Sequence, residues 1–293
     1  MFRVGILGTE NSHATKFASI FNTPDAAGNF VYPDFKVTAL YAMEKEPSEK
    51  IKNDIDPSIT IVNSIEEMIS LVDCIMVTAR HGKYHAEMAL PFIEKGMPAF
   101  IDKPFTIDIA EGRKILETAR KNNVPLCGGS GCKFAPQILD NYNTIQAGTY
   151  GLPTFGFIDF PGNLEGDYGG IYFYGVHAVE MALFSFGMDV KAVTAHINGN
   201  NLMSVLHYEK FDVVLNFATA RKNQVITFYA KNTIYNPLDI SKIFDVECEM
   251  FVNMVRSGKS PMTDDQLLAP VVVLNAIDRS ARQGRKVNIT ELN

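Results

Sequence analysis

The first 127 residues alternate short apolar segments with segments of helical periodicity. Strands are expected at residues 2–7, 36–43, 60–62, 73–78, 99–101 and 124–127. Helices are expected at residues 12–21, 47–53, 85–95 and 109–122, and another begins at Ser64. Apolar strands separated by amphipathic helices are typical of a parallel sheet covered on both faces. The sequence therefore predicts an α/β domain with a doubly wound parallel sheet over residues 1–122.

The pattern changes after about residue 150, where several strands alternate apolar with polar or small residues. Strands are expected at residues 155–160, 192–198, 204–208, 212–218 and 224–229, and helices at 176–186, 245–256 and 267–283. Such alternation indicates a largely antiparallel open sheet with one face covered by helices. We expect an α+β domain over residues 123–293.

Length and composition exclude several classes of protein. A chain of 293 residues can bury two cores. Its net charge of −6 argues against a general nucleic-acid binder, which needs a basic face. No apolar run reaches the roughly 18 residues of a membrane span, and the N-terminus enters a strand directly, so no signal peptide is expected. The scattered cysteines, without a C-x-x-C pair, indicate reduced thiols and a cytoplasmic protein.

The segment from Ala99 to Phe105 brings charge to the end of a strand. Pro104 has no N–H and a fixed φ, so the strand has to end before it. Asp102 and Lys103 are therefore expected at the carboxyl edge of the sheet, where ligands bind in open α/β folds. Lys103 is a candidate proton donor or acceptor. The alternative is a salt-bridging pair that caps the strand.

The turn after the first strand raises the question of a dinucleotide. If Gly8 is the first glycine of a G-x-G-x-x-G fingerprint, Glu10 and His13 occupy the second and third glycine positions. Glu10 brings negative charge towards phosphate unless its side chain turns away. The next helix, with Ser12 as its expected N-cap, still offers free N–H groups to an anion.

Other polar groups in the same region could assist a nucleotide. Thr9, Asn11 and Ser12 offer hydroxyl and amide donors. Glu44 lies slightly late for the acid that binds ribose hydroxyls after the second strand. Two interpretations stay open on these residues, a dinucleotide site or a Rossmann-like fold without a nucleotide.

Several segments in order resemble the Gfo/Idh/MocA family of oxidoreductases. Asp102-Lys103-Pro104 matches the Glu-Lys-Pro signature of that family, with Asp for Glu. Residues 77–86 resemble its fourth strand and following loop, and residues 133–136 resemble the segment after its sixth strand. Residues 169–180 resemble its Gly-Gly-x-x-x-Asp-x-Gly-x-His-x-x-Asp segment, and residues 251–287 its last helices. The resemblance covers nearly the whole chain.

The resemblance implies hydride transfer between NAD or NADP and a hydroxyl-bearing carbon of a small sugar- or cyclitol-like substrate. It also implies that the C-terminal domain binds the substrate and forms a homodimer or homotetramer through its sheet. The net charge and the absence of a long apolar run argue against a nucleic-acid or membrane partner. The cofactor is then expected to contact Gly8, Thr9, Glu10, Asn11, Ser12, Glu44, Thr78, Ala79, Arg80, His85, Asp102 and Lys103.

The resemblance also assigns catalytic roles. Lys103 matches the lysine that hydrogen-bonds the reacting oxygen, and His177 matches the histidine that serves as acid or base. The aspartate usually found four residues before that histidine is Phe173 here, and Arg80 replaces a usual proline. Together with the altered glycine loop, these differences indicate an atypical branch.

Other candidates have two interpretations each. Lys133 is a candidate substrate contact or a solvated lysine, and Tyr172 and Tyr174 line a substrate ring or pack in the core. His81 and His85 have the spacing of a metal pair but no third ligand, so no metal is expected. The alternative function is a non-catalytic relative that binds or senses a small molecule.

Overall fold

The computed structural model describes residues 1–199, 201–217 and 223–292. The chain forms two compact units. The first contains residues 1–106, 110–129 and 244–264, and the second contains residues 107–109, 130–243 and 265–293. Compared with the expected boundary after residue 122, the first unit also includes the strand Leu126–Gly129 and nearly all of the helix Ile243–Ser257.

The first unit is built from alternating strands and helices. Its strands are β1 (Phe2–Leu7), β2 (Phe35–Tyr41), β3 (Thr60–Ile61), β4 (Cys74–Val77), β5 (Ala99–Asp102) and β6 (Leu126–Gly129). Its helices are α1 (Ser12–Asn22), α2 (Lys45–Asp54), α3 (Ile65–Ile69), α4 (His85–Ile93), α5 (Ile109–Asn122) and α8 (Ile243–Ser257), with a 3-10 turn, η1, at Gly82–Tyr84.

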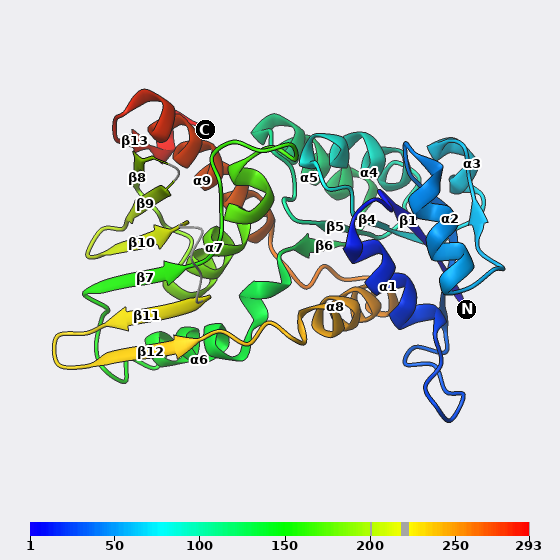
Figure 1. Cartoon of the computed structure of the whole chain (residues 1–293), viewed down its shortest axis with the longest axis horizontal. Helices are drawn as coiled ribbons and strands as arrows, with labels where there is room; N and C mark the ends of the chain where they lie inside the picture. Colours follow the sequence, from blue (N-terminus) through cyan, green and yellow to red (C-terminus); the bar gives the residue numbers. More distant parts are fainter. Residues whose placement is uncertain (200, 218–222, 293) are drawn as a thin grey trace. The chain divides into compact units, whose positions relative to one another are not determined.

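The strands of the first unit pair in parallel in the order β3-β2-β1-β4-β5-β6. Helices α1 and α8 lie on one face, and α3, α4 and α5 lie on the other (Figure 1). Phe17 and Phe21 of α1 share a buried cluster with Phe251 of α8. Burying each of these rings contributes about 1.5–3 kcal/mol. The doubly wound parallel sheet expected from the sequence is confirmed.

Local signals explain where these elements begin and end. Strand β5 ends at Asp102, two residues before Pro104, as expected. The N-cap of α1 is Asn11, not Ser12, because the Asn11 carboxamide oxygen accepts the His13 N–H. Ser64 caps α3 as expected and accepts the Glu67 N–H.

The second unit contains the remaining strands and helices. Its strands are β7 (Phe155–Asp159), β8 (Ala192–Asn198), β9 (Asn201–His207), β10 (Asp212–Asn216), β11 (Gln224–Phe228), β12 (Thr233–Pro237) and β13 (Val287–Asn288). Its helices are α6 (Pro136–Gln146), α7 (Ile171–Phe186) and α9 (Asp264–Gln283), which begins at the boundary, with 3-10 turns η2 (Gly131–Phe134) and η3 (Ile289–Glu291).

The sheet of the second unit runs β12-β11-β7-β10-β9-β8-β13, and only the β7–β10 pair is parallel among the described strand pairs. Alternate residues of β9, β10 and β11 are buried, and they join α7 and α9 in one core. The expected α+β architecture is confirmed. Strand β12 was not expected from the sequence. All of its residues are half-buried or exposed. Ala218, the last residue of an expected strand, lies outside the described residues.

The described helices include none that is both long and apolar enough to span a membrane.

Candidate active site

The carboxylate of Asp102 lies at the carboxyl end of β5, where the sequence places it, and is completely buried. Its Oδ1 accepts the backbone N–H of Lys103 at 2.7 Å, and its Oδ2 lies 2.7 Å from Nδ1 of His13. Burial by itself raises the pKa of Asp102, but the charge and hydrogen bond of His13 oppose it, so that the pKa is lowered. Lys103 is also buried, with 2% of its surface exposed.

His13 takes the place of the third glycine of a dinucleotide fingerprint. Its ring is directed to the end of β5 and packs edge-on against Phe244 of α8, with 4.8 Å between ring centroids. In the usual fingerprint this glycine allows close packing of helix on strand. Here the hydrogen bond from His13 to Asp102 and the aromatic contact with Phe244 hold the start of α1 against the end of β5 and against α8.

Glu10 takes the place of the second glycine, and its side chain turns towards the loop after β4. Its Oε1 accepts the backbone N–H of Arg80 at 3.0 Å. The loop keeps its turn at Gly8, where φ is +87° and a Cβ atom would lie 2.2 Å from the Ala79 nitrogen. With Glu10 held by Arg80, the positive end of the α1 dipole remains suited to a diphosphate.

Two of the expected cofactor donors are bound within the protein. The hydroxyl of Thr9 pairs with Ser48 at 2.7 Å, and the Asn11 amide nitrogen donates to the Thr78 carbonyl at 2.9 Å. Ser12 is exposed at the start of α1. Glu44 is exposed just before α2, three residues after β2 ends at Tyr41. The backbone of this loop and Ser12 are therefore the groups best suited to hold phosphate.

Hydrogen bonds of Thr78 and His85 hold the loop after β4 in place. The Thr78 hydroxyl donates to the carbonyl oxygens of Leu7 and Gly8 at 3.1 and 3.0 Å. His85 is fully buried, with Nε2 2.7 Å from the Ala79 carbonyl and Nδ1 3.3 Å from the Phe105 carbonyl. Burial lowers the pKa of His85. Thr78 and His85 thus shape the backbone at Ala79 and Arg80.

His177 lies in the second turn of α7, not at the start of a helix as the sequence suggested. It is 7% exposed and packs against the ring of Phe160, with the centroids 5.1 Å apart. Its Nδ1 lies 2.6 Å from the hydroxyl oxygen of Ser130. Ser130 follows β6 and was not singled out from the sequence, because a serine in a glycine-rich turn carries no distinct signal.

Lys133 forms a buried ion pair and is not a solvated lysine. Its Nζ lies 2.6 Å from Oε2 of Glu180, and the two side chains are 5% and 3% exposed. The other carboxylate oxygen of Glu180 accepts the Ser130 N–H at 2.9 Å. Glu180 was also missed, although its position three residues after His177 places both on one face of α7.

The aromatic residues before His177 differ in how far they are buried. Tyr172 packs against the core of the second unit, and burial raises its pKa. Phe173 packs between Tyr168 and Tyr174, with centroid distances of 5.1 and 4.7 Å. Tyr174 is 45% exposed, and its ring lies 6.2 Å from that of His177. Of the two predicted tyrosines, Tyr174 is accessible to a ligand.

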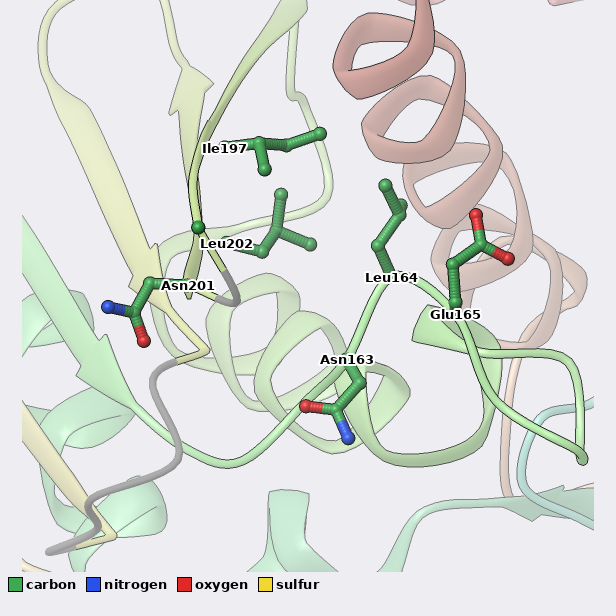
Figure 2. Close-up of a pocket in the computed structure, with 7 residues that line it drawn as sticks. Asn163, Leu164, Glu165, Ile197, Asn201 and Leu202 are labelled. Atoms are coloured by element: carbon green, nitrogen blue, oxygen red, sulfur yellow. The ribbon is translucent and has the colours of Figure 1, made fainter.

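A separate cavity of about 460 Å³ lies in the second unit, and Figure 2 shows Leu164 facing Ile197 and Leu202 across it. Its other lining residues are Asn163, Glu165, Gly199 and Asn201. Glu165 is paired with Arg282 at 2.9 Å. None of the predicted catalytic residues lines this cavity. Among the described residues, no group of three or more His, Cys, Asp or Glu side chains is arranged to hold a metal.

Comparison with known proteins agrees with this geometry. The family model described as "Oxidoreductase family, NAD-binding Rossmann fold" matches residues 2–129. The scyllo-inositol 2-dehydrogenase (NAD(+)) of Bacillus subtilis is 23% identical over 254 residues, which cover 70% of this chain and 74% of that protein. The inositol 2-dehydrogenase of Agrobacterium fabrum is 28% identical over 120 residues, covering 39% of this chain and 32% of that protein.

The fold is also shared along the whole chain with solved structures. The apo scyllo-inositol dehydrogenase of Lactobacillus casei superposes with a TM-score of 0.84 at 12% identity, covering 99% of this chain and 98% of that one. The expected cofactor class is confirmed by the NAD-binding family model. Residues 2–129 therefore match the NAD-binding Rossmann domain of this oxidoreductase family, as the motifs of that segment predicted.

Proposed function

We propose that this chain is a dehydrogenase that oxidises a hydroxyl-bearing carbon of a cyclitol or similar polyhydroxylated ring. The observation that carries the proposal is Lys103, a buried lysine directly after the carboxyl end of β5 in the NAD-binding sheet. A lysine at the carboxyl edge of such a sheet, where ligands bind, is suited to hydrogen-bond the reacting oxygen of a substrate. The names of the Bacillus and Agrobacterium relatives support an inositol as the substrate class.

The cofactor is assigned to the loop that joins β1 to α1. The Gly8 turn and the N-terminus of α1 hold the diphosphate, and Ser12 adds a hydroxyl. Glu44 binds the ribose hydroxyls, and the backbone of Ala79 and Arg80 borders the cofactor where β4 ends. When bound there, NAD would supply the acceptor for the hydride of the substrate carbon.

Lys103 and His177 are assigned different roles at the reacting oxygen of the substrate. Lys103 donates a hydrogen bond that polarises the oxygen, and His177 takes up the proton of the alcohol. Phe173 replaces a family aspartate and can neither accept a proton nor orient the imidazole. Tyr174 supplies an accessible aromatic face for the C–H side of a sugar-like ring. Lys133 is assigned a structural role, because Glu180 compensates its charge.

A nucleotide titration tests the proposal before any substrate is known. We expect NADH or NADPH to bind with micromolar affinity, followed by nicotinamide fluorescence, and myo- or scyllo-inositol to reduce NAD⁺. Lys103→Met should lower kcat by at least 100-fold and keep NADH affinity within about threefold. Lys114→Met, which removes an exposed lysine of α5, is the matched control.

The alternative, a binding protein without redox chemistry, is favoured by one set of observations, the replacement of two fingerprint glycines and the family aspartate by Glu10, His13 and Phe173. Failure of all four nicotinamide nucleotides to bind at millimolar concentration would decide for it. Binding without turnover of cyclitols or sugars would keep the cofactor site and reject the substrate class.

The open face of the second-unit sheet supports a homo-oligomer. Strand pairing places an apolar row across this face, consisting of Tyr235, Ile226, Phe157, Val214 and Val205. These residues are half-buried or exposed, whereas their neighbours along each strand are largely buried under helices. A dimer or tetramer through this row would remove it from water.

We further propose a cytoplasmic location. All four cysteines are buried and none forms a disulfide, as is usual for proteins of a reducing compartment.

A further inference from the structure

The hydroxyl of Ser130 is bound from two sides in a buried position. Ser130 is 1% exposed, and its Oγ accepts the Cys132 N–H at 3.1 Å. The same oxygen lies 2.6 Å from Nδ1 of His177. The Cys132 N–H occupies one lone pair of this oxygen. The hydroxyl hydrogen and the second lone pair remain to bond with the imidazole of His177, one or the other at a time.

Glu180 fixes Ser130 against the same helix face. Its Oε1 accepts the Ser130 N–H at 2.9 Å, while its Oε2 holds Lys133 at 2.6 Å. His177 and Glu180 are three residues apart on α7, so neighbouring side chains of one helix bind both the backbone and the hydroxyl of Ser130. The bond from the Ser130 N–H to Glu180 therefore helps to keep the Ser130 hydroxyl next to His177.

We infer that Ser130 is a positioning residue that acts through His177. A serine hydroxyl donates to Nδ1 when that nitrogen carries no proton and accepts from it when it does. Nδ1 thus stays hydrogen-bonded in each protonation state of the ring, and the proposed proton exchange with the substrate is assigned to Nε2. The kinetic part of this inference rests on the proposed function, whereas the hydrogen bond itself does not.

This arrangement offers His177 a partner in the absence of the family aspartate. Phe173, one turn earlier on α7, cannot hydrogen-bond the ring, and Glu180 is engaged by Ser130 and Lys133. Unlike an aspartate, a hydroxyl partner orients the imidazole without adding a negative charge beside it. The proton stays on His177 or the substrate, and Ser130 neither gains nor loses one overall.

Nuclear magnetic resonance of ¹⁵N-histidine-labelled protein tests the hydrogen bond without a substrate. At a pH where the ring is neutral, Ser130→Ala should move the His177 Nδ1 shift towards that of a nitrogen without a hydrogen bond. Ser130→Thr should keep the wild-type shift, because its backbone (φ −86°, ψ 125°) suits threonine. A shift left unchanged by Ser130→Ala would overturn the inference.

Kinetics with scyllo-inositol and NAD⁺ test the positioning role. Ser130→Ala should lower kcat by about 10- to 100-fold, as for other residues that orient functional histidines, and leave KM within about twofold. Ser130→Thr should restore most of kcat. In a His177→Gln background, Ser130→Ala should cause no further loss; an additive loss would show a merely structural role and reject the inference.

Ser185→Ala is the matched control. Ser185 is a buried serine of α7, and its hydroxyl has no hydrogen-bond partner among the described residues. Its removal should change neither the His177 shift nor kcat. If the wild type turns over no cyclitol but the spectra behave as expected, the substrate proposal fails while the assignment of the Ser130–His177 bond stands.

Discussion

His13 at the start of α1 and Asp102 at the end of β5 are hydrogen-bonded, with 2.7 Å between Nδ1 and Oδ2. Asp102 is fully buried, and the His13 side chain is 15% exposed. The pair joins the position of a missing fingerprint glycine to the residue that precedes Lys103, the proposed catalytic lysine. The change in the loop after β1 is thus accompanied by a contact with the end of β5.

Breaking this pair should destabilise the protein in a pH-dependent way. Because the folded-state pKa of Asp102 is lowered, its contribution is present above the ordinary value of 3.8 and is lost as the pH falls below it. Asp102→Asn should cost about 3 kcal/mol at pH 7, as for loss of one partner of a buried pair. Urea unfolding at pH 7 and pH 3 measures both effects.

The variant should also lose less stability than the wild type between pH 5 and pH 3, since the titrating group is gone. Asp25→Asn is a suitable control, because its exposed carboxylate has a lowered pKa but its partners all lie in residues 27–29 of the same loop. An Asp102→Asn variant as stable as the wild type at pH 7 would contradict the stabilising role of the pair.

Glu10 should support cofactor binding through Arg80. Glu10→Gly removes the bond from the Arg80 N–H and frees the chain at the turn, so we expect NADH affinity to fall by about five- to tenfold, equivalent to roughly 1 kcal/mol. Glu10→Gln keeps an acceptor and should stay within about threefold. Fluorescence titration measures both. Tighter binding by Glu10→Gly would instead identify the loop as an impaired nucleotide site.

The Lys133–Glu180 pair should be strongly coupled. Lys133→Met leaves the Glu180 carboxylate buried beside an apolar side chain, so we expect a loss of about 3–5 kcal/mol in the free energy of unfolding. Adding Glu180→Gln should recover part of that loss. Chemical denaturation of the single and double variants measures the coupling.

Lys191→Met provides the comparison for that pair. Lys191 pairs with Asp189, but the two side chains are 52% and 77% exposed, and such pairs contribute little. No measurable change in unfolding is expected for this variant. Equal effects of Lys191→Met and Lys133→Met would show that burial does not strengthen the coupling of Lys133 to Glu180.

The apolar row on the second sheet should control assembly. Val214 pairs with Phe157 on β7 and Val205 on β9, so it lies in the middle of this row. Val214→Glu places a charge at the proposed interface and should produce monomers, measured by light scattering. Met43→Glu, at a residue of the first unit that is 56% exposed, should leave the mass unchanged. A wild-type monomer would rule out the interface.

Much of the architecture was determined by local sequence. The alternation of apolar strands and amphipathic helices predicted both sheets, and Pro104 predicted the end of β5. These features depend on residues close in the chain. The order of motifs around Asp102 also predicted the oxidoreductase family whose NAD-binding model matches residues 2–129.

The partners of the site residues were decided only by tertiary structure. His13 and Asp102 are 89 residues apart, Glu10 and Arg80 are 70 apart, and Ser130 and His177 are 47 apart. No local periodicity predicts such pairs, because each forms where separate elements pack together. The sequence by itself determined the elements and the residues able to do chemistry. Tertiary packing decided which charges are neutralised, which loops are held in place and which side chain contacts Nδ1 of His177.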